Sequence, residues 1–573
     1  MKMKLVCIVY FLCSSVAVHA LDRAAFTFTK YDLNVRVEPE QQRLGVRGKI
    51  ALRNDSDAPQ RSLSLQISSS LNWSSIQFEG KPVEFVSQIY TSDVDHTGAL
   101  SEAIVVLPRS VPPKQTIKLE IGYEGLIPQD TTRLTRIGVP DDTAKHSDWD
   151  QIGRTFTAVR GIGYVAWYPV ATEAVSLTDG DSMPESVAKW KQRVAPTEMR
   201  ISLAYVRSSS EAPPELLCNG TEANKTIEEA GAAQHLTLEC SFESLGFMLP
   251  TFVIAPYLEI SGKDVVIHYL PDHKSGAEDY ASAVEEDAPL VSKWLGDHRE
   301  HSTAKPEVAE LSDPKAASFE SGNMLLMPLN GSDTKLLLSA AQQLTHAFFP
   351  SPHAWIYDGL ASYAQVRLVE EKEGRQAAIA YLEAHRSALV ELEKVAGKRK
   401  ADDDSLISSL DDFRIQTKSM YVWWMLRDMA GEDALDAALH NYKAADDKDS
   451  AYMQKLIETQ AHRDLHWFFD DWMYHDRGLP DFRVESVYPS QLPRGGYMVT
   501  VTVENLGEAG AEVPVTLHMQ TGEASERLLI RGRSKASVRI QAPSLPQEVT
   551  VNDGSTPESD ISNNGYKVEP VNR

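Results

Sequence analysis

The chain has 573 residues, which is long enough for several domains. Apolar residues make up 42% and charged residues 24%, as in ordinary globular proteins, which excludes a wholly disordered or collagen-like chain. The net charge of −24 would repel a phosphate backbone, and the densest basic run, Lys398-Arg399-Lys400, is followed closely by three aspartates. We therefore expect no nucleic-acid partner.

The first twenty residues have the pattern of a secretory signal peptide. Lys2 and Lys4 precede an apolar stretch, which ends in the small-residue cleavage pattern Val18-His19-Ala20. Residues 1–20 are therefore predicted to be removed, and the mature protein to be secreted or periplasmic. The stretch is too short for a membrane span, and no later apolar run reaches the roughly 18 residues that a span needs, so we expect no transmembrane helix.

Residues 22–260 contain short runs in which apolar and polar residues alternate, with turn residues between them. Such runs, for example at residues 31–37 and 117–121, predict an N-terminal antiparallel β domain. This region contains Cys218 and Cys240, the two cysteines outside the signal peptide. An oxidising compartment would let them form a disulfide across a hairpin-like segment, and no neighbouring Cys/His pattern indicates a metal or redox site.

The spacing of apolar residues becomes helical after residue 260 and stays so to about residue 480. The predicted helical ranges are 280–294, 335–349, 359–395, 419–442 and 451–474, with a strand at 324–327 and a charged connector at 398–412. Residues 481–573 return to alternation, with Tyr497, Val499, Val501 and Val503 on one face, and predict a C-terminal immunoglobulin-like β sandwich. The expected fold class is multidomain α+β.

One stretch of the helical region has the spacing of a zinc-hydrolase motif. Such sites often place two histidines four residues apart on one helix face, with a glutamate base beside the first and a carboxylate on a later helix. Gln342 and His346 occupy the two histidine positions of this frame, and Gln343 occupies the base position. Asp358, in Trp355-Ile356-Tyr357-Asp358-Gly359-Leu360-Ala361-Ser362-Tyr363, stands where the later carboxylate would be.

In these residues the chain resembles the aminopeptidase N family of zinc metallopeptidases, the gluzincins. The family's motif is H-E-x-x-H followed by W-L-N-E-G-x-A-S-Y, and residues 355–363 match its second part closely. Residues 416–427 and 464–480 resemble later segments of the family's catalytic domain, so the likeness covers about residues 26–485. It implies a mainly helical metallopeptidase-type domain at 261–480.

The resemblance implies roles for four residues, and all four are substituted. It aligns Gln342 with the first zinc-ligand histidine, Gln343 with the base glutamate, Asp358 with the ligand glutamate and Gln416 with the transition-state tyrosine. A neutral amide cannot take a proton from water, so we expect base catalysis of roughly 10²–10⁴-fold to be lost. A glutamine carbonyl is a poor exchange for imidazole on zinc, and an aspartate is about 1.5 Å shorter than a glutamate. A zinc ion would rest on His346, Asp358 and Gln342, and the substitutions favour its absence.

The family strand that binds the substrate's amino terminus aligns with Gly322, Met324 and Leu325. In this alignment the apolar Leu325 replaces the glutamate that holds the substrate amine. Eleven residues separate His346 from Asp358, fewer than in active members of the family, so the loop that lines the site is shortened.

Structural interpretations compete with these chemical ones. His346 lies on an apolar helix face and could be a core histidine, and Asp358 could be a helix N-cap. His353 could supply the missing imidazole, although the prolines before it suggest a loop. His462 and His466 are also four residues apart, but no glutamate occupies the base position and the matching family segment is structural.

The leading hypothesis is an exported protein with an aminopeptidase-like fold and a dismantled catalytic centre, which serves as a peptide-binding or structural module. Its partners would be peptides or protein termini, and its oligomeric state is open. The first alternative is a working zinc aminopeptidase with atypical ligands, namely His346 and Asp358 with His353 or Gln342. The second is a surface adhesion or assembly protein in which the two β regions dominate.

Overall fold

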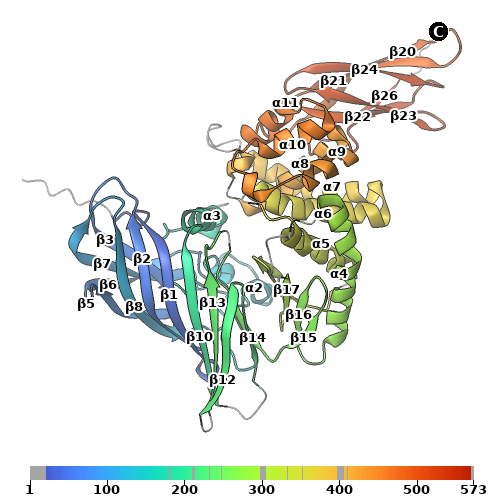
Figure 1. Cartoon of the computed structure of the whole chain (residues 1–573). Coiled ribbons are helices and arrows are strands. Elements are labelled where there is room, and N and C mark those ends of the chain that lie inside the picture. The colour runs from blue at the N-terminus through green and yellow to red at the C-terminus, as the bar shows by residue number, and fades with distance from the viewer. Residues whose placement is uncertain are drawn as a thin grey trace, which may run out of the picture.

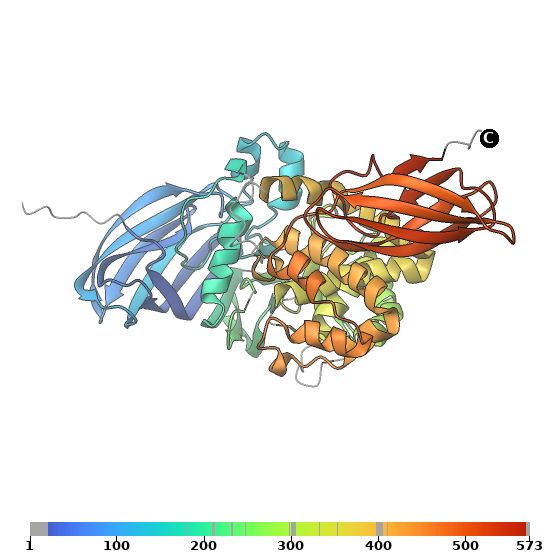
Figure 2. The same ribbon diagram turned by 90° about the horizontal axis from the view of Figure 1, so that it is seen from above.

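The computed structural model describes residues 21–179, 182–208, 213–230, 233–246, 248–296, 298, 305–331, 333–351, 353–396, 405–409 and 411–568. The predicted signal peptide and most of the predicted charged connector lie outside these residues. Sheets of the N-terminal region lie at one end of the molecule, helices in the middle and the C-terminal sheets at the other end (Figures 1 and 2). Among the described residues, no helix has the length and apolar character needed to cross a membrane.

The largest sheet has eight strands in the order β12-β13-β10-β1-β2-β8-β4-β5. Its strands are β1 (Phe26–Glu38), β2 (Arg43–Asn54), β4 (Leu71–Phe78), β5 (Lys81–Pro82), β8 (Thr116–Leu126), β10 (Glu198–Ser208), β12 (Thr221–Ala230) and β13 (Ala233–Phe242). All neighbouring strands are antiparallel except β1 and β10, which are parallel. The predicted antiparallel layer therefore contains one parallel pair, because a long crossover brings the chain back to the free edge of β1.

Two three-stranded sheets complete the N-terminal region. One has the order β3-β7-β6, with β3 (Gln60–Ser68), β7 (Ala99–Val111) and β6 (Glu84–Thr91), and the other has the order β11-β14-β9, with β11 (Glu215–Cys218), β14 (Phe252–Ala255) and β9 (Thr157–Val159). Three helices that alternation did not predict interrupt the strands: α1 (Thr132–Arg136), α2 (Asp141–Ser147) and α3 (Ser182–Val194). Helix α3 packs on β1, where Trp190 meets Phe28 edge-on at 5.3 Å between ring centroids.

The middle region combines a five-stranded sheet with the main helices. The sheet has the order β15-β16-β17-β19-β18, with β15 (Leu258–Ser261), β16 (Val266–Tyr269), β17 (Glu307–Glu310), β19 (Met324–Met327) and β18 (Phe319–Ser321). The helices are α4 (Lys274–Leu295), α5 (Asp333–Phe348), α6 (Ala354–Glu373), α7 (Arg375–Ala396), α8 (Asp412–Ala430), α9 (Glu432–His440), α10 (Tyr452–Ala461) and α11 (His466–Phe469), followed by a π-helical turn (Asp470–Tyr474).

Each predicted helical range contains a helix, and the predicted strand at 324–327 coincides with β19. Three of the ranges contain a break that periodicity did not show: one lies between α10 and α11, and the other two are at glycines. Gly374, with φ of 88°, ends α6, and Gly431, with φ of 91°, ends α8. Glycine adopts this backbone conformation without a Cβ clash, so the apolar pattern can continue on both sides of a helix end.

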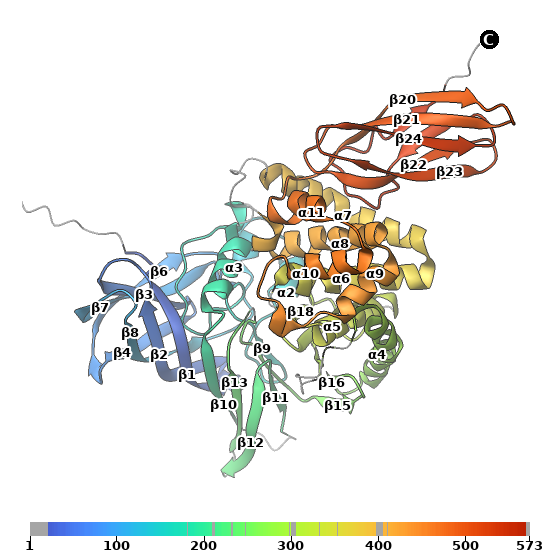
Figure 3. The ribbon, with the colours of Figure 1, turned by 45° about the horizontal axis from the view of Figure 1, so that its top comes forward.

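The C-terminal strands form two sheets that share one core. The first has the order β20-β21-β24, with β20 (Phe482–Gln491), β21 (Tyr497–Asn505) and β24 (Lys535–Ala542); the second has the order β23-β22-β25-β26, with β23 (Glu523–Ile530), β22 (Ala511–His518), β25 (Glu548–Val551) and β26 (Gly565–Lys567). The predicted inward face of β21 is confirmed, since Val499, Val501 and Val503 are buried. The sheets lie at the end of the helical region that carries α11 (Figure 3). They meet it at the π-helical turn that follows α11, where Trp472 donates to the carbonyl of Gly510 at 2.8 Å.

Helix α4 contains a buried carboxylate that makes folding sensitive to pH. Asp287 is fully buried, and within the described residues neither of its carboxylate oxygens has a hydrogen-bond partner. Burial raises the pKa of Asp287 from 3.8 to about 7. Between these values the folded chain holds a proton that the unfolded chain has released, so this group's contribution to stability falls as pH rises.

The Asp287→Asn variant is expected to become more stable relative to the parent as pH rises from 4 to 8, by up to about 4 kcal/mol. Urea unfolding of both proteins at pH 4, 6 and 8 measures the difference. A difference that stays constant across this range would show that Asp287 is ionised in the folded protein.

Candidate active site

Three elements bring the predicted site residues together. Helix α5 carries Gln342, Gln343 and His346, helix α6 carries Asp358, and the short strand β18 approaches α5 with Glu320. The side chains of His346 and Asp358 meet between the two helices, as the zinc-hydrolase frame predicts for these two positions.

His346 is the centre of a buried charge cluster. Its Nδ1–H donates to the carboxylate of Glu320, and its Nε2 lies 3.5 Å from Oδ1 of Asp358. The ring stacks on Tyr357, with centroids 4.1 Å apart and planes at 12°. Burial alone would lower the pKa of His346, but the two carboxylates outweigh it and raise this pKa to about 10. The side chain is therefore a charged imidazolium at neutral pH.

The residues around His346 supply an incomplete set of zinc ligands. A zinc-ligand histidine commonly donates its second ring N–H to a carboxylate, as His346 does to Glu320, so this contact does not argue against a metal. Nε2 of His346 faces Asp358, but the third position of the frame holds the amide of Gln342, whose Oε1 accepts a hydrogen bond from Gln365. In the part of the chain that the structure describes, no three His, Cys, Asp or Glu side chains are grouped to hold a metal ion.

Gln343, at the base position, is used for packing. Its side chain is only 2% exposed, its Oε1 accepts a hydrogen bond from the hydroxyl of Tyr280 at 3.1 Å, and its Nε2 donates to the carbonyl of Asn323 at 3.2 Å. The amide thus links α5 to α4 and to the turn between β18 and β19. Glutamine can donate and accept at once, whereas an ionised glutamate can only accept.

Gln342, at the position of the first zinc-ligand histidine, is also an amide with a structural contact. Oε1 of Gln342 accepts a hydrogen bond at 3.1 Å from Gln365 of α6. Gln416, at the position of the transition-state tyrosine, is half-buried in α8. These two side chains and Asp358 are the partly exposed members of the predicted site.

The predicted substrate-binding strand belongs to the core. Met324 and Leu325 are buried in β19, and Gly322 forms the β18–β19 turn with φ of 62°. This left-handed φ favours glycine, and a Cβ at Gly322 would also displace the side chain of Met248, whose sulfur would lie 2.5 Å away. A peptide would have to displace this strand to contact its side chains.

The structure contradicts two of the alternative interpretations and places the second histidine pair on different helices. Asp358 is not an N-cap, because α6 begins at Ala354 and its N-cap is His353. His353 does not join His346, because its Nε2 lies 3.1 Å from Oδ1 of Asp447. His462 ends α10 in a left-handed conformation while His466 begins α11, so this pair does not share one helix face.

Sequence reasoning missed Glu320, Tyr280 and Tyr357. Tyr357 could have been suspected from the sequence, because it is an aromatic residue directly before the candidate ligand Asp358. Glu320 and Tyr280 lie 26 and 63 residues from their partners on α5, so no local spacing relates them.

The order of β region, helical region with a five-stranded sheet, and C-terminal β region is similar to that of a solved structure. This is the crystal structure of aminopeptidase A from Legionella pneumophila in complex with aspartic acid, with a TM-score of 0.61 and 11% sequence identity. The match covers 95% of this chain but 60% of that protein, so this chain spans about three-fifths of its length. No family model and no curated protein sequence matches the chain. The likeness establishes the fold alone.

Proposed function

We propose that this chain is a non-catalytic protein of gluzincin type, in which the former catalytic centre has become a buried structural anchor. In this proposal residues 22–260 form the β domain, residues 261–480 the metallopeptidase-type domain and residues 481–573 an immunoglobulin-like sandwich, and residues 1–20 direct export. The observation that carries the proposal is the position of Gln343. The residue that would activate water is nearly inaccessible, and both ends of its amide are hydrogen-bonded.

A structural role is favoured over capture of peptides or protein termini. Gln343, Met324 and Leu325 would face a bound peptide in a working member of the family, and all three are buried here. The Glu320–His346–Asp358 cluster holds β18, α5 and α6 together by paired charges. Buried charges that are paired in this way hold their elements in one arrangement and tolerate little loss of a partner.

The proposal is tested by restoring the family residues. The Gln342→His, Gln343→Glu, Asp358→Glu triple variant is expected to bind no stoichiometric zinc and to release no arylamine from aminoacyl-arylamide substrates, because the shortened loop between residues 346 and 358 changes the spacing of the ligands and residue 343 stays inaccessible. Metal analysis and a chromogenic assay with added zinc measure both properties. A variant that gains zinc and chelator-sensitive activity would show that the site remained open for catalysis.

A single substitution tests whether Gln343 has a packing role at this site. Gln343→Glu is expected to lower the free energy of unfolding by about 1–3 kcal/mol, because a carboxylate would face the carbonyl of Asn323 with no proton to donate. Gln342→Glu is the matched control, since Gln342 accepts from Gln365 and a carboxylate can still accept. Urea unfolding compares the two. Equal free energies of unfolding for the two variants would show that the hydrogen bonds of Gln343 do not stabilise the fold.

A further inference from the structure

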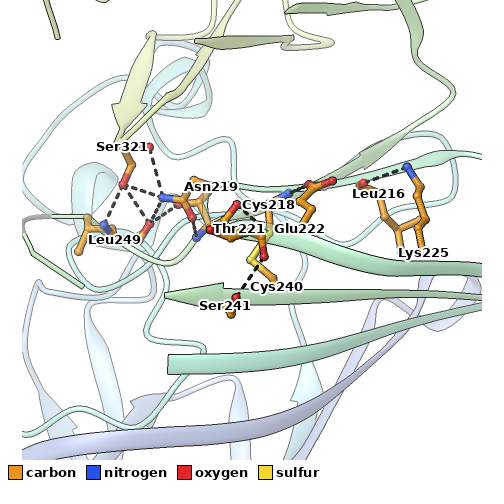
Figure 4. Close-up of a disulfide and its surroundings, with 12 residues drawn as sticks. Leu216, Cys218, Asn219, Thr221, Glu222, Lys225, Cys240, Ser241, Leu249 and Ser321 are labelled. Carbon is orange, nitrogen blue, oxygen red and sulfur yellow. Dashed lines mark hydrogen bonds between the residues drawn. A yellow bond between two sulfur atoms is a disulfide. The ribbon is translucent and has the colours of Figure 1, made fainter. Parts of the chain in front are cut away.

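The disulfide between Cys218 and Cys240 fixes a turn that faces the middle region. Cys218 ends β11 and Cys240 lies in β13, so the bond joins strands of two different sheets (Figure 4). Gly220, two residues after Cys218, lies against the bond, because a Cβ there would come within 2.8 Å of the sulfur of Cys240. The path of the turn is therefore set by the disulfide and by the lack of a side chain at residue 220.

The turn presents Asn219 to strand β18. The Asn219 side chain is 8% exposed, and its Nδ2 donates to Oγ of Ser321 at 2.9 Å and to the carbonyl of Leu249 at 2.8 Å. Its Oδ1 accepts from the backbone N–H of Thr251 at 2.9 Å. Ser321 also accepts from the backbone N–H of Leu249 at 2.8 Å (Figure 4). These hydrogen bonds are buried, so they join the turn to β18 at a site that water does not reach.

Strand β18 has only three residues, and its neighbouring side chains point in opposite directions. Ser321 is held by Asn219, and the adjacent Glu320 is held by His346 of α5. On the other side of Glu320, Phe319 meets Tyr164 of the N-terminal region edge-on at 5.2 Å. The N-terminal region thus contacts β18 at Phe319 and at Ser321, the two residues that flank Glu320.

We propose that Asn219 and Ser321 are positioning residues, which the Cys218–Cys240 disulfide holds in place and which aim Glu320 at His346. Loss of the disulfide or of the Asn219 amide would free Ser321 from the N-terminal region and weaken the contact between the adjacent Glu320 and His346, without any change in α5 itself. The inference goes beyond the proposed function, because it holds whether or not the site is catalytic.

The test is a pair of double-mutant cycles in the full chain. Glu320→Gln is measured by urea unfolding in the parent and in the Asn219→Ala background, which keeps both cysteines. If Asn219 positions Glu320, the destabilisation caused by Glu320→Gln shrinks by about half or more in the Asn219→Ala background, because the contact is already weakened. If Asn219 stabilises the fold without positioning Glu320, the destabilisations caused by Asn219→Ala and Glu320→Gln add up. Such additivity would overturn the proposal.

Thr226→Ala is the matched control for this cycle. Thr226 and Thr237 share an exposed hydroxyl contact in the β12–β13 hairpin, which follows the turn that carries Asn219. We expect Thr226→Ala and Glu320→Gln to be additive.

Hydrogen exchange tests the role of the disulfide itself. In the Cys218→Ser, Cys240→Ser variant, amides of residues 319–327 are expected to exchange about tenfold faster, while those of β21 in the C-terminal region keep their parent rates. Faster exchange confined to β11, β12 and β13 would contradict transmission to β18. If this variant does not fold, the Asn219→Ala cycle decides the proposal alone.

Discussion

His346→Ala is expected to lower the free energy of unfolding by about 3–5 kcal/mol, because it removes a buried cation, leaves two half-buried carboxylates unpaired and opens a cavity beside Tyr357. Glu320 and Asp358 would face each other across the emptied ring position, and Tyr357 would lose its stacking partner. A residue whose role is to hold a metal would behave differently, since its loss would release the ion and leave the apoprotein's packing intact.

Urea unfolding measures this effect, and His475→Ala is its control. His475 pairs with Asp470, but its side chain is 64% exposed, so its loss should cost no more than about 1 kcal/mol. Equal effects of the two substitutions, together with loss of a bound metal from His346→Ala, would identify His346 as a ligand.

Lys418→Met is the second substitution with a large expected effect, again about 3–5 kcal/mol. Lys418 is fully buried in α8, and its ammonium lies 2.7 Å from Glu393 of α7 and contacts Asp476, which follows the π-helical turn. Arg414 also reaches Asp476, at 2.5 Å. Methionine fills the same space but leaves Glu393 and Asp476 with one cation between them.

Lys455→Met provides the matched control for Lys418→Met. Lys455 pairs with Asp449 at 2.6 Å, and both side chains are more than half exposed, so the same substitution there should change stability by about 0–1 kcal/mol. Chemical unfolding of both variants, followed by tryptophan fluorescence, gives the comparison. A loss for Lys418→Met as small as that for Lys455→Met would mean that the buried cluster does not hold α7, α8 and the π-helical turn together.

The type and order of the elements could be predicted from the sequence, because each depends on local periodicity. The five helical ranges between residues 280 and 474 and the inward valines of β21 follow from apolar spacing, but the breaks that divide three of these ranges do not. The parallel pairing of β1 with β10 could not be predicted, since it depends on a crossover of more than a hundred residues. Helix α3 was missed because it lies within a region where strand signals dominate.

The candidate site could be located but not interpreted completely. The spacing of His346 and Asp358 placed both residues correctly near each other, on α5 and α6. Whether His346 is a ligand or a charged anchor depends on Glu320, whose position no local pattern relates to α5. The family-like residues Trp355 and Gly359 pack α6 on α8, where a Cβ at Gly359 would come within 2.5 Å of the Cβ of Ser419. The packing part of the motif is thus present while its chemical part is replaced.

The most direct test is to incubate the purified wild-type protein with excess zinc, dialyse it, and then measure bound metal and the release of free amino acids from short peptides. We expect far less than one zinc per chain and no release above buffer. One tightly bound zinc per chain, with hydrolysis that a chelator and Asp358→Asn both abolish, would contradict a non-catalytic centre.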